Sequence, residues 1–435
     1  MNTRVKSLTV ILKLTALLTA VYGQDLQTSE SSDKGYQNVD NIGGPKSIGN
    51  QLQEDNNKYL FEYRLPVKHM KSWYDLKGKI NKNTGIQFGI NYSAVYVYST
   101  STIASTNKAS AASGILDIQG GWNLLGRKSG KNKGTLFVKF NSRHSYGGSS
   151  ITSPMFHGLI ESGYYGLPST AFRHYSFRIV ELNWQQNLAD DKVAFVIGKV
   201  DITNYFNFHG LIVPWQHFMG YGSSVSGTVN WANVGLGAIL SVRPLENWYV
   251  MGGMVDVYGD LFEKGDFFDL GRNWQNGDFM YLAEVGYVPT FAERYFKKVS
   301  LTYWQSSPYN SAGGTAIGKG NGLAFTAHWF FQDRFAPFFR FGFSDGAGEN
   351  TFYKKDIQIG HGLRFRHYDI LGTSLSWNEP NIDGEKDQYT GEIFYRINIT
   401  AHFEITPSVQ LIVNPTFNPN TNSLVYFGLR GRITL

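Results

Sequence analysis

The last stretch of the chain, residues 424–435, reads LVYFGLRGRITL and keeps a strict alternation of side-chain character. Its apolar side chains occupy every second position: Val425, Phe427, Leu429, Ile433 and Leu435. This spacing places them on one face of a β-strand. Chain ends usually fray. A strand that holds its pattern to the last residue is therefore expected to pair along its whole length, as the closing strand of a sheet would.

The first residues carry the pattern of a secretory signal peptide. Residues 1–23 read MNTRVKSLTVILKLTALLTAVYG, with basic residues near the start, an apolar stretch and small residues at the end. The apolar run from Leu14 to Val21 is too short for a membrane-spanning helix, which needs about 20 residues. We therefore predict an exported protein whose mature chain begins near Gln24.

Composition narrows the class of protein. Aromatic residues make up 15% of the chain and charged residues 17%; glycines number 48, and cysteine is absent. Without cysteine the chain has no disulfide, thiolate metal site or cysteine nucleophile. Basic and acidic residues nearly balance after residue 23, so nucleic acid is not an expected partner. No later apolar run reaches about 18 residues, which favours a membrane β-barrel or a secreted β-sandwich or propeller over helical spans.

Two segments precede the region of alternating pattern. Residues 24–58 are rich in Ser, Asn, Gln, Asp and Gly, and we expect a polar flexible segment. In residues 59–84 apolar side chains recur at helical spacing: Val67, Met70, Trp73, Leu76 and Ile80. The expected amphipathic helix would cover an apolar edge at a barrel mouth. Binding of a partner or of a lipid surface is the alternative.

From Gly85 onward the sequence alternates with a period of two. The first such segment reads GIQFGINYSAVYVY and places Ile86, Phe88 and Ile90 on one face. With it, sixteen segments are predicted as strands: 85–98, 112–125, 134–144, 174–187, 192–201, 233–243, 246–258, 278–288, 296–305, 321–331, 335–345, 355–366, 369–378, 390–403, 407–414 and 424–435.

The connections between these segments alternate in length. Short ones include ADD (189–191), RPLEN (243–247), FQDR (331–334), HY (367–368) and EITP (404–407), whereas the longest span 145–173 and 202–232. Long and short connections then lie on opposite rims, as in an up-and-down barrel of even strand number with tight periplasmic turns. We predict that residues 85–435 form an all-β outer-membrane barrel of about 16 strands, with outer-membrane lipid and the barrel assembly machinery as partners.

Alternation also assigns side chains to the interior of the barrel. The inward set mixes both charges with amides and rings, and its substrate-path candidates are Glu181, Gln185, Glu284, Trp304, Arg340, Glu392 and Arg396. Sixteen strands leave an aqueous passage. Balanced charge and rings suit a neutral polyol, whereas an anion pore would need a basic ring. A general diffusion porin, whose lumen charges only hydrate the pore, remains an equal alternative on these residues.

Three segments resemble the carbohydrate-selective porins of the OprB family. The first is ELNWQQNLADDKVAFVIGKVD, residues 181–201, with Gln185, Gln186 and Gly198. The second is FAPFFRFGFSDG, residues 335–346, which contains a Pro-Phe-x-Arg-x-Gly run. The third, EIFYRINITAHFEITPSVQLIVNP, carries the Glu-x-x-Tyr, Pro-x-x-Gln and Asn-Pro pattern at Glu392, Tyr395, Pro407, Gln410, Asn414 and Pro415.

The resemblance implies a sixteen-stranded porin for glucose and related small sugars, narrowed by inward-folded loops. The sequence leaves open whether the protein forms a homo-oligomer. We expect the loops 145–173 and 202–232 to set the bore, because they carry aromatic anchors: Tyr164, Tyr165, Tyr205, Phe206, Trp215 and His217. A structural barrel, an adhesin and an enzyme are the remaining alternatives. The lone His361 has no accompanying catalytic motif, so no catalytic residue, cofactor or metal site is predicted.

Overall fold

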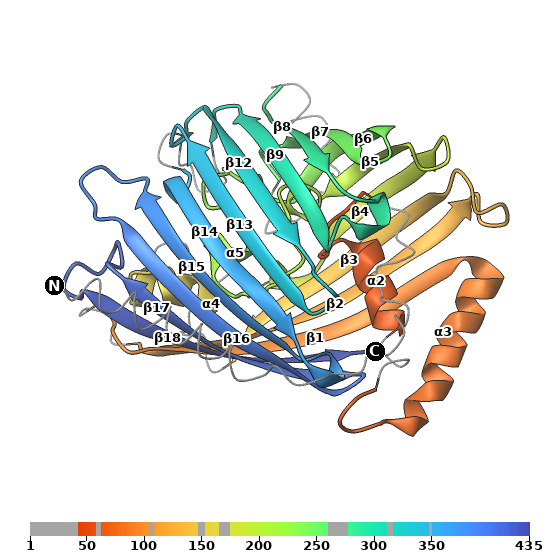
Figure 1. The fold of residues 1–435 in the computed structure, drawn as a ribbon, viewed down its shortest axis with the longest axis horizontal. Helices are drawn as coiled ribbons and strands as arrows, with labels where there is room; N and C mark the ends of the chain where they lie inside the picture. Colours follow the sequence, from red (N-terminus) through yellow and green to blue (C-terminus); the bar gives the residue numbers. More distant parts are fainter. Residues whose placement is uncertain are drawn as a thin grey trace. The chain divides into compact units, whose positions relative to one another are not determined.

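Alternating side chains organise the chain into a closed antiparallel β-barrel (Figure 1). The computed structural model describes residues 42–57, 62–103, 108–146, 153–164, 175–259, 277–310, 316–347 and 350–435. The expected signal peptide, residues 1–23, lies outside these residues. The barrel strands are β1 (Ile86–Ser99), β2 (Ser110–Leu125), β3 (Gly134–Ser145), β4 (Tyr175–Leu188), β5 (Val193–Val200), β6 (Gly235–Leu245), β7 (Trp248–Asp256), β8 (Phe279–Tyr287), β9 (Lys297–Ser306), β12 (Gly320–Trp329), β13 (Phe335–Ser344), β14 (Tyr353–Arg364), β15 (Ile370–Pro380), β16 (Gln388–Thr400), β17 (Phe403–Val413) and β18 (Ser423–Thr434).

These 16 strands confirm the predicted fold and strand number. Each strand pairs with its neighbours along the sequence, and the last pairs with the first. At this seam, Tyr98 of β1 lies opposite Phe427 of β18. Leu435 extends the pairing, because its N–H donates to the carbonyl of Ile90 at 2.8 Å and its carbonyl accepts from the Ile90 N–H at 3.0 Å. The closing strand thus leaves no unpaired edge at the point where the sequence pattern ends.

The connections alternate between short and long as expected, with two corrections. Residues 243–245 of the expected turn RPLEN belong to β6, so the turn before β7 is residues 246–247. Between β16 and β17 the turn lies at Ala401 and His402, so EITP at 404–407 belongs to β17. Pro407 had suggested a turn, yet it sits within the strand opposite Leu429 of β18. The pairing of β16 with β17 is interrupted at Pro407, which has no N–H to donate. A small separate hairpin, β10 (Tyr309–Asn310) with β11 (Ala316–Ile317), lies in the connection between β9 and β12.

Short helices accompany the barrel: α2 (Ile48–Asn57), α3 (Lys71–Thr84), α4 (Pro154–Phe156), α5 (Tyr221–Ser224), and the single turns η2 (Lys68–Met70), η3 (His157–Glu161), η4 (Ile202–Asn204), η5 (Phe291–Glu293) and η6 (Arg366–Tyr368). Among the described residues, none of these helices has the length and apolar composition needed to cross a membrane.

Helix α3 occupies the last part of the expected helical range 59–84. Gly85 ends it with a φ of 80°, which glycine adopts without steric cost. The helix packs beside the barrel seam: the ring of Trp73 meets Phe88 of β1 at 5.8 Å, and Tyr74 stacks on His402 at 5.3 Å. The Lys77 ammonium donates to the carbonyl of Leu435 at 3.3 Å.

Helix α2 differs from the polar flexible segment expected for residues 24–58. Residues up to 41 lie outside the described part of the chain, but residues 42–57 are largely buried and end in this helix. Ile48 and Leu52 pack against the inward ring of Phe137 on β3, and α2 lies along β1, β2 and β3. The helix has too few apolar residues for a periodic pattern to indicate it in the sequence. Its remaining contacts are with polar groups of the barrel wall.

Side chains divide between the two faces of the wall. On β13 the outward Phe339, Phe341 and Phe343 are 40–49% exposed, whereas the inward Arg340 and Ser344 are buried. His361 of β14 also faces outward, with its Nδ1 at 3.1 Å from the hydroxyl of Thr373. Its strand pairing is continuous on both sides, so no bulge turns it toward the interior.

Candidate functional site

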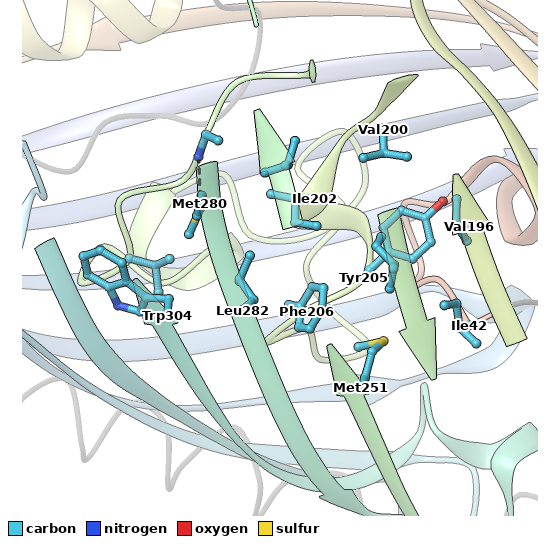
Figure 2. Close-up of a cluster of buried hydrophobic side chains, with 14 of the residues drawn as sticks. Ile42, Val196, Val200, Ile202, Tyr205, Phe206, Met251, Met280, Leu282 and Trp304 are labelled. Atoms are coloured by element: carbon cyan, nitrogen blue, oxygen red, sulfur yellow. Dashed lines mark hydrogen bonds between the residues drawn. The ribbon is translucent and has the colours of Figure 1, made fainter. Parts of the chain in front are cut away.

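The connection between β5 and β6, residues 201–234, folds into the barrel, and we call it the inner loop. Most of its side chains are buried. Figure 2 shows Ile202, Tyr205 and Phe206 of this loop beside apolar side chains of the wall, among them Val196, Met251, Met280, Leu282 and Trp304. A loop with so much apolar packing adopts one position in the lumen.

Glu284 of β8 anchors the start of the inner loop. Its side chain is 1% exposed, and its Oε2 accepts from the backbone N–H of Asn207 at 2.7 Å and from the hydroxyl of Thr302 at 2.6 Å. Its Oε1 accepts from Tyr249 at 2.5 Å and lies 3.4 Å from the Lys298 ammonium. These partners satisfy a carboxylate that would otherwise be costly to bury.

Arg340 of β13 holds the same part of the inner loop. Its guanidinium donates to the side-chain oxygen of Asn207 at 2.7 Å and to the carbonyl of Gly222 at 3.2 Å. It also donates to the hydroxyl of Thr326 on β12 at 3.3 Å. The side chain is 4% exposed, so it contacts the loop and not the aqueous space.

Glu392 of β16 anchors the middle of the inner loop. Its two carboxylate oxygens accept from the backbone N–H groups of Met219 at 2.6 Å and Gly220 at 2.9 Å. A Cβ added at residue 220 would lie 2.9 Å from the Glu392 Oε2, which is closer than normal contact. Glycine at this position therefore lets the backbone approach the carboxylate.

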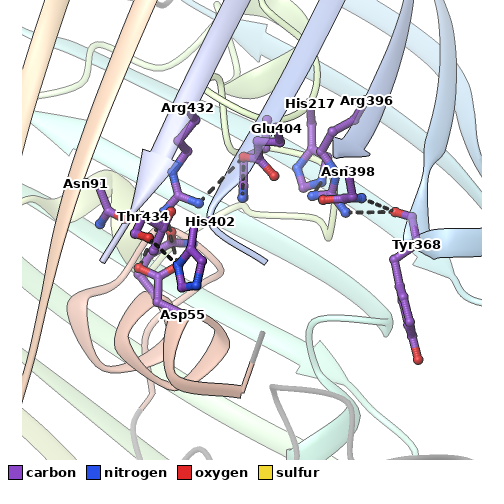
Figure 3. Close-up of polar contacts among 12 residues, drawn as sticks. Asp55, Asn91, His217, Tyr368, Arg396, Asn398, His402, Glu404, Arg432 and Thr434 are labelled. Atoms are coloured by element: carbon purple, nitrogen blue, oxygen red, sulfur yellow. Dashed lines mark hydrogen bonds and ion pairs between the residues drawn. The ribbon is translucent and has the colours of Figure 1, made fainter. Parts of the chain in front are cut away.

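Arg396, four residues after Glu392 on β16, contacts a histidine of the inner loop (Figure 3). Its Nη1 lies 3.2 Å from Nε2 of His217, and its Nη2 donates to the carbonyl of Tyr368 at 3.4 Å. Burial lowers the pKa of His217 well below its usual range, and the nearby Arg396 and Arg430 act in the same direction. His217 is therefore neutral and can accept a hydrogen bond from the guanidinium.

Glu181 and Gln185 of β4 contact the first turn of the inner loop. The Glu181 carboxylate accepts from the side-chain amide of Asn204 at 3.2 Å, and the amide of Gln185 donates to the Tyr205 hydroxyl at 3.2 Å. Trp304 of β9 is fully buried in the apolar cluster that includes Phe206 and Ala324. Its indole covers Gly322, where a Cβ would lie 2.6 Å from its Nε1.

The seven candidate path residues thus share one environment. All of them face the interior, as their strand positions predicted, and all are 0–7% exposed: Glu181, Gln185, Glu284, Trp304, Arg340, Glu392 and Arg396. Each of the six polar ones has a partner on the inner loop. Alternation in a strand gives the face of a side chain, but not what covers that face.

A second element enters the lumen, residues 42–57, which we call the N-terminal insert. Figure 3 shows Asp55 of this insert beside Arg432 of β18, with Oδ1 and Nη2 3.2 Å apart. The same guanidinium donates to the side-chain oxygen of Asn91 at 2.8 Å and lies 3.6 Å from Glu404. At the other end of the insert, the carbonyl of Gly43 accepts from the Tyr295 hydroxyl at 2.5 Å.

Some interior residues keep part of their surface accessible, in contrast to the seven candidates. They come from the wall, the insert and the inner loop: Lys139, Arg143, Arg178, Lys46, Asp201, Thr203, Trp215 and Tyr221. Three of them form a chain of hydrogen bonds, because the Lys46 ammonium donates to the Thr203 hydroxyl at 3.1 Å and this hydroxyl donates to Asp201 at 2.6 Å. The site therefore offers donors, acceptors and rings together.

Arg178 is an interior residue that strict alternation assigns to the lipid. Glu181 lies opposite Lys139 on β3, but Ile179 lies opposite Phe140, so β4 carries one extra residue at Val180. This bulge reverses the parity at Ile179 and Arg178 and places Arg178 opposite the inward Asn141, until a second register shift between Asn141 and Arg143 restores the parity at Tyr175. A charged Arg next in the outward series after Trp184, Leu182 and Val180 is the signal in the sequence that could have revealed the bulge.

A polar cluster on β2, β3 and β4 continues this accessible surface. The amide of Asn141 donates to Asp117 at 2.6 Å and its oxygen accepts from Arg143 at 2.9 Å and from the Tyr175 hydroxyl. The Arg143 guanidinium lies 5.2 Å from the Tyr175 ring centre. Lys139, 3.7 Å from Asp117, has a side chain that is 19% exposed.

The expected pair of bore-setting loops is described only in part. Of the loop 145–173, residues 145–146 and 153–164 are described, and Tyr164 is buried against Tyr426. Tyr165 lies outside the described residues. In the loop 202–232, Tyr205, Phe206 and His217 are buried and Trp215 is partly accessible. That these two loops set the bore stays a prediction.

Comparison with solved structures gives the same barrel. The structure of Pseudomonas putida OprB at high pH matches with a TM-score of 0.66 at 15% identity, over 84% of this chain and 97% of that one. The low-pH structure matches with a TM-score of 0.50 at 13% identity, over 86% and 100%. A triple mutant of Rhodopseudomonas blastica porin gives 0.50 at 10% identity, over 80% and 100%.

Sequence comparison finds a family match at the C-terminal end of the chain. Residues 366–435, which include β15 to β18, match the family described as "Carbohydrate-selective porin, OprB family". Among curated proteins, no sequence relative was found. The last strands of the chain are thus similar to the OprB family of carbohydrate-selective porins, and the barrel as a whole is similar in fold to solved porin structures.

Proposed function

We propose that the protein is a porin of the bacterial outer membrane through which small neutral sugars diffuse passively. The family description supports sugars as the transported class. The apolar outer face, with Phe339, Phe341 and Phe343 partly exposed, supports contact with outer-membrane lipid. Insertion by the barrel assembly machinery and association into homo-oligomers belong to the same proposal.

One observation carries the proposal: the inner loop is fixed inside the lumen and leaves a mixed polar and aromatic surface. Lys139 supplies a donor, Asp201 an acceptor and Thr203 both, while Trp215 and Tyr221 supply rings. Sugar hydroxyls need donors and acceptors together, and the C–H faces of a sugar pack on aromatic rings. A pore built only for hydration would not need its bore fixed by so many buried contacts.

Transport requires that these contacts be weak. A site that held a sugar firmly would block the flux through the pore, so several weak contacts in series serve better. Each exchanged hydrogen bond contributes about 0.5–1.5 kcal/mol, because the sugar gives up water to make it. The accessible residues of the wall, insert and inner loop offer such a series.

The seven residues predicted for the substrate path take an indirect part in this proposal. Glu284, Arg340, Glu392 and Arg396 hold the inner loop against the wall. They would determine selectivity through the position of the loop, because their own side chains are covered. Their substitution is therefore expected to change the bore as well as the sugar preference.

Liposome swelling tests the proposal. The purified protein is reconstituted, and swelling rates are compared for neutral sugars of graded size and for amino acids and anions of equal size. Faster entry of the sugars at equal size supports a sugar porin. Equal rates for all solutes would identify a general diffusion pore, and absence of swelling would indicate a structural barrel. Leu411→Ala, a change on the outer face of β17, should leave the preference unchanged.

A further inference from the structure

We propose that the N-terminal insert, residues 42–57, is a resident part of the constriction, and that Lys46 of the insert forms a sugar-contacting site with Thr203 and Asp201 of the inner loop. This inference rests on the proposed function and deepens it. It assigns one side of the sugar path to a segment that precedes the barrel in the sequence. It also names the polyol class of ligand that the site would recognise.

The insert is attached to the barrel at both ends. At its C-terminal end, Asp55 pairs with Arg432 at 3.2 Å, and both side chains are almost fully buried. In its middle, Ile48 and Leu52 pack on Phe137. At its start, the Gly43 carbonyl accepts from Tyr295 at 2.5 Å. A segment held at three levels of the lumen is expected to stay in place during transport.

Its first residues lie against the inner loop. The backbone N–H of Gly44 donates to the carbonyl of Asn204, and the side-chain amide of Asn50 donates back to the Gly44 carbonyl at 2.7 Å. A Cβ at residue 44 would lie 2.8 Å from the ring of Phe208. The absence of a side chain at Gly44 thus permits the close contact that brings Lys46 to the inner loop.

Lys46 connects the two elements by polar contacts that a sugar could share. Its ammonium donates to Thr203 at 3.1 Å, and Thr203 donates to the Oδ1 of Asp201 at 2.6 Å. All three residues are only partly buried. Lys139 and Glu181 of the wall lie within electrostatic range of Lys46, so the local charge is nearly balanced.

This arrangement fits a neutral polyol better than an ion. Adjacent hydroxyl groups on a sugar can accept from the ammonium and donate to the carboxylate at the same time. A free anion would meet Asp201 and Glu181, and a free cation would meet Lys46 and Lys139, so each would be repelled by part of the site. The ligand class that pairs with both signs is one with many hydroxyls and no charge.

The absence of native cysteine allows a direct test in the full-length protein. Single-channel conductance of the Lys46→Cys variant is recorded in planar bilayers before and after a cationic methanethiosulfonate reagent is added. Because a bulky group at a constriction obstructs ion flow, conductance should fall by about half or more. The matched control is Lys79→Cys on the exposed surface of α3, where the same reagent should leave conductance unchanged.

A second variant tests whether the Lys46 ammonium contacts the sugar, separately from where the insert lies. Lys46→Gln keeps a donor but removes the charge, and sugar entry into liposomes should slow by about two- to fivefold relative to ion conductance, because a neutral hydrogen bond replaces a charge-assisted one. Conductance of labelled Lys46→Cys that matches the unlabelled channel, or failure of the reagent to reach it in folded barrels, would overturn the placement of the insert. Sugar exclusion by the unchanged protein would instead overturn the proposed function.

Discussion

Glu392 of β16 accepts a hydrogen bond from the backbone N–H of Met219 at 2.6 Å, although more than 170 residues separate the two in the sequence. The contact ties the inner loop to the opposite side of the barrel from the strands that carry it. A charged acceptor contributes about 1.5–3 kcal/mol to such an attachment.

Glu392→Ala should therefore loosen the inner loop. We expect single-channel conductance to rise and to fluctuate between levels, because the loop then visits positions away from the wall. The measurement is planar-bilayer recording. Glu379→Ala, which removes an accessible partner of Lys355 near the end of β15, is the control and should leave the current steady. An unaltered Glu392→Ala channel would show that apolar packing alone positions the loop.

Gly198 of β5 should not tolerate a side chain. Its φ of +134° is unfavourable for other residues, and a Cβ would lie 2.8 Å from the Cα of Asn183 on β4 and still closer to the Leu182 carbonyl. Gly198→Ala is expected to lower barrel stability by about 2 kcal/mol or more.

Gly252 of β7 provides the comparison for this substitution. At that position the nearest atom to an added Cβ is 4.0 Å away, so Gly252→Ala should be nearly neutral. Stability is measured as the temperature at which the folded barrel loses its compact mobility in detergent electrophoresis. Similar temperatures for the two variants would contradict the steric argument.

Arg178 should influence the ion selectivity of the pore. Because the bulge in β4 turns it inward, Arg178→Glu replaces a lumen cation by an anion, and the channel should become more selective for cations. Reversal potentials in a salt gradient measure the change. Lys128→Glu, in the exposed turn between β2 and β3, carries the same charge change outside the lumen and should have little effect. Equal reversal potentials for Arg178→Glu and the unchanged protein would place residue 178 on the lipid side.

Acid should release the segment before α3 from the barrel rim. Burial alone would raise the pKa of Asp369, but hydrogen bonds from Arg64, the Asn398 N–H and Tyr395 outweigh it and leave this pKa lowered. A lowered folded-state pKa contributes stability above the unfolded value of about 3.9, which is lost as the pH falls through the folded value. Protease cleavage between residues 58 and 67 should therefore increase when the pH falls below the folded-state pKa of Asp369. Asp369→Asn should show the same cleavage at neutral pH, and a pH-independent pattern in both proteins would contradict this.

The sequence predicted the wall of the barrel well because its signals are local. Alternation, as in Phe339 and Arg340, needs only neighbouring residues, and short turns mark the strand ends. The inner loop and the N-terminal insert could not be predicted in the same way. Asp55 and Lys46 acquire their structural roles from Arg432 and Thr203, and no period in the sequence connects these pairs.

The candidate site shows the same division. The face of Glu181 followed from its strand, but its burial depends on Asn204 of a loop that folds back over it. Strict alternation would place Arg178 on the lipid face, because it does not account for the extra residue at Val180 that shifts the register, and a bulge has no reliable local signature. Strand patterns therefore predicted which wall residues face the interior. The route open to a solute depends instead on the inner loop and the N-terminal insert, which occupy that interior.

The anchors of the inner loop also impose an order on how the protein matures. The loop leaves β5, yet its partners Arg340 and Glu392 belong to β13 and β16, which lie 133 and 173 residues further along the chain than the loop residues they contact. Until those strands pair, the side chain of Asn207 lacks the Arg340 guanidinium and the backbone of Met219 lacks the Glu392 carboxylate, and closing such long chain segments is entropically slow. A newly inserted barrel should thus pass through a stage that leaks before it discriminates, and the time spent there would be the cost to the cell of each new pore.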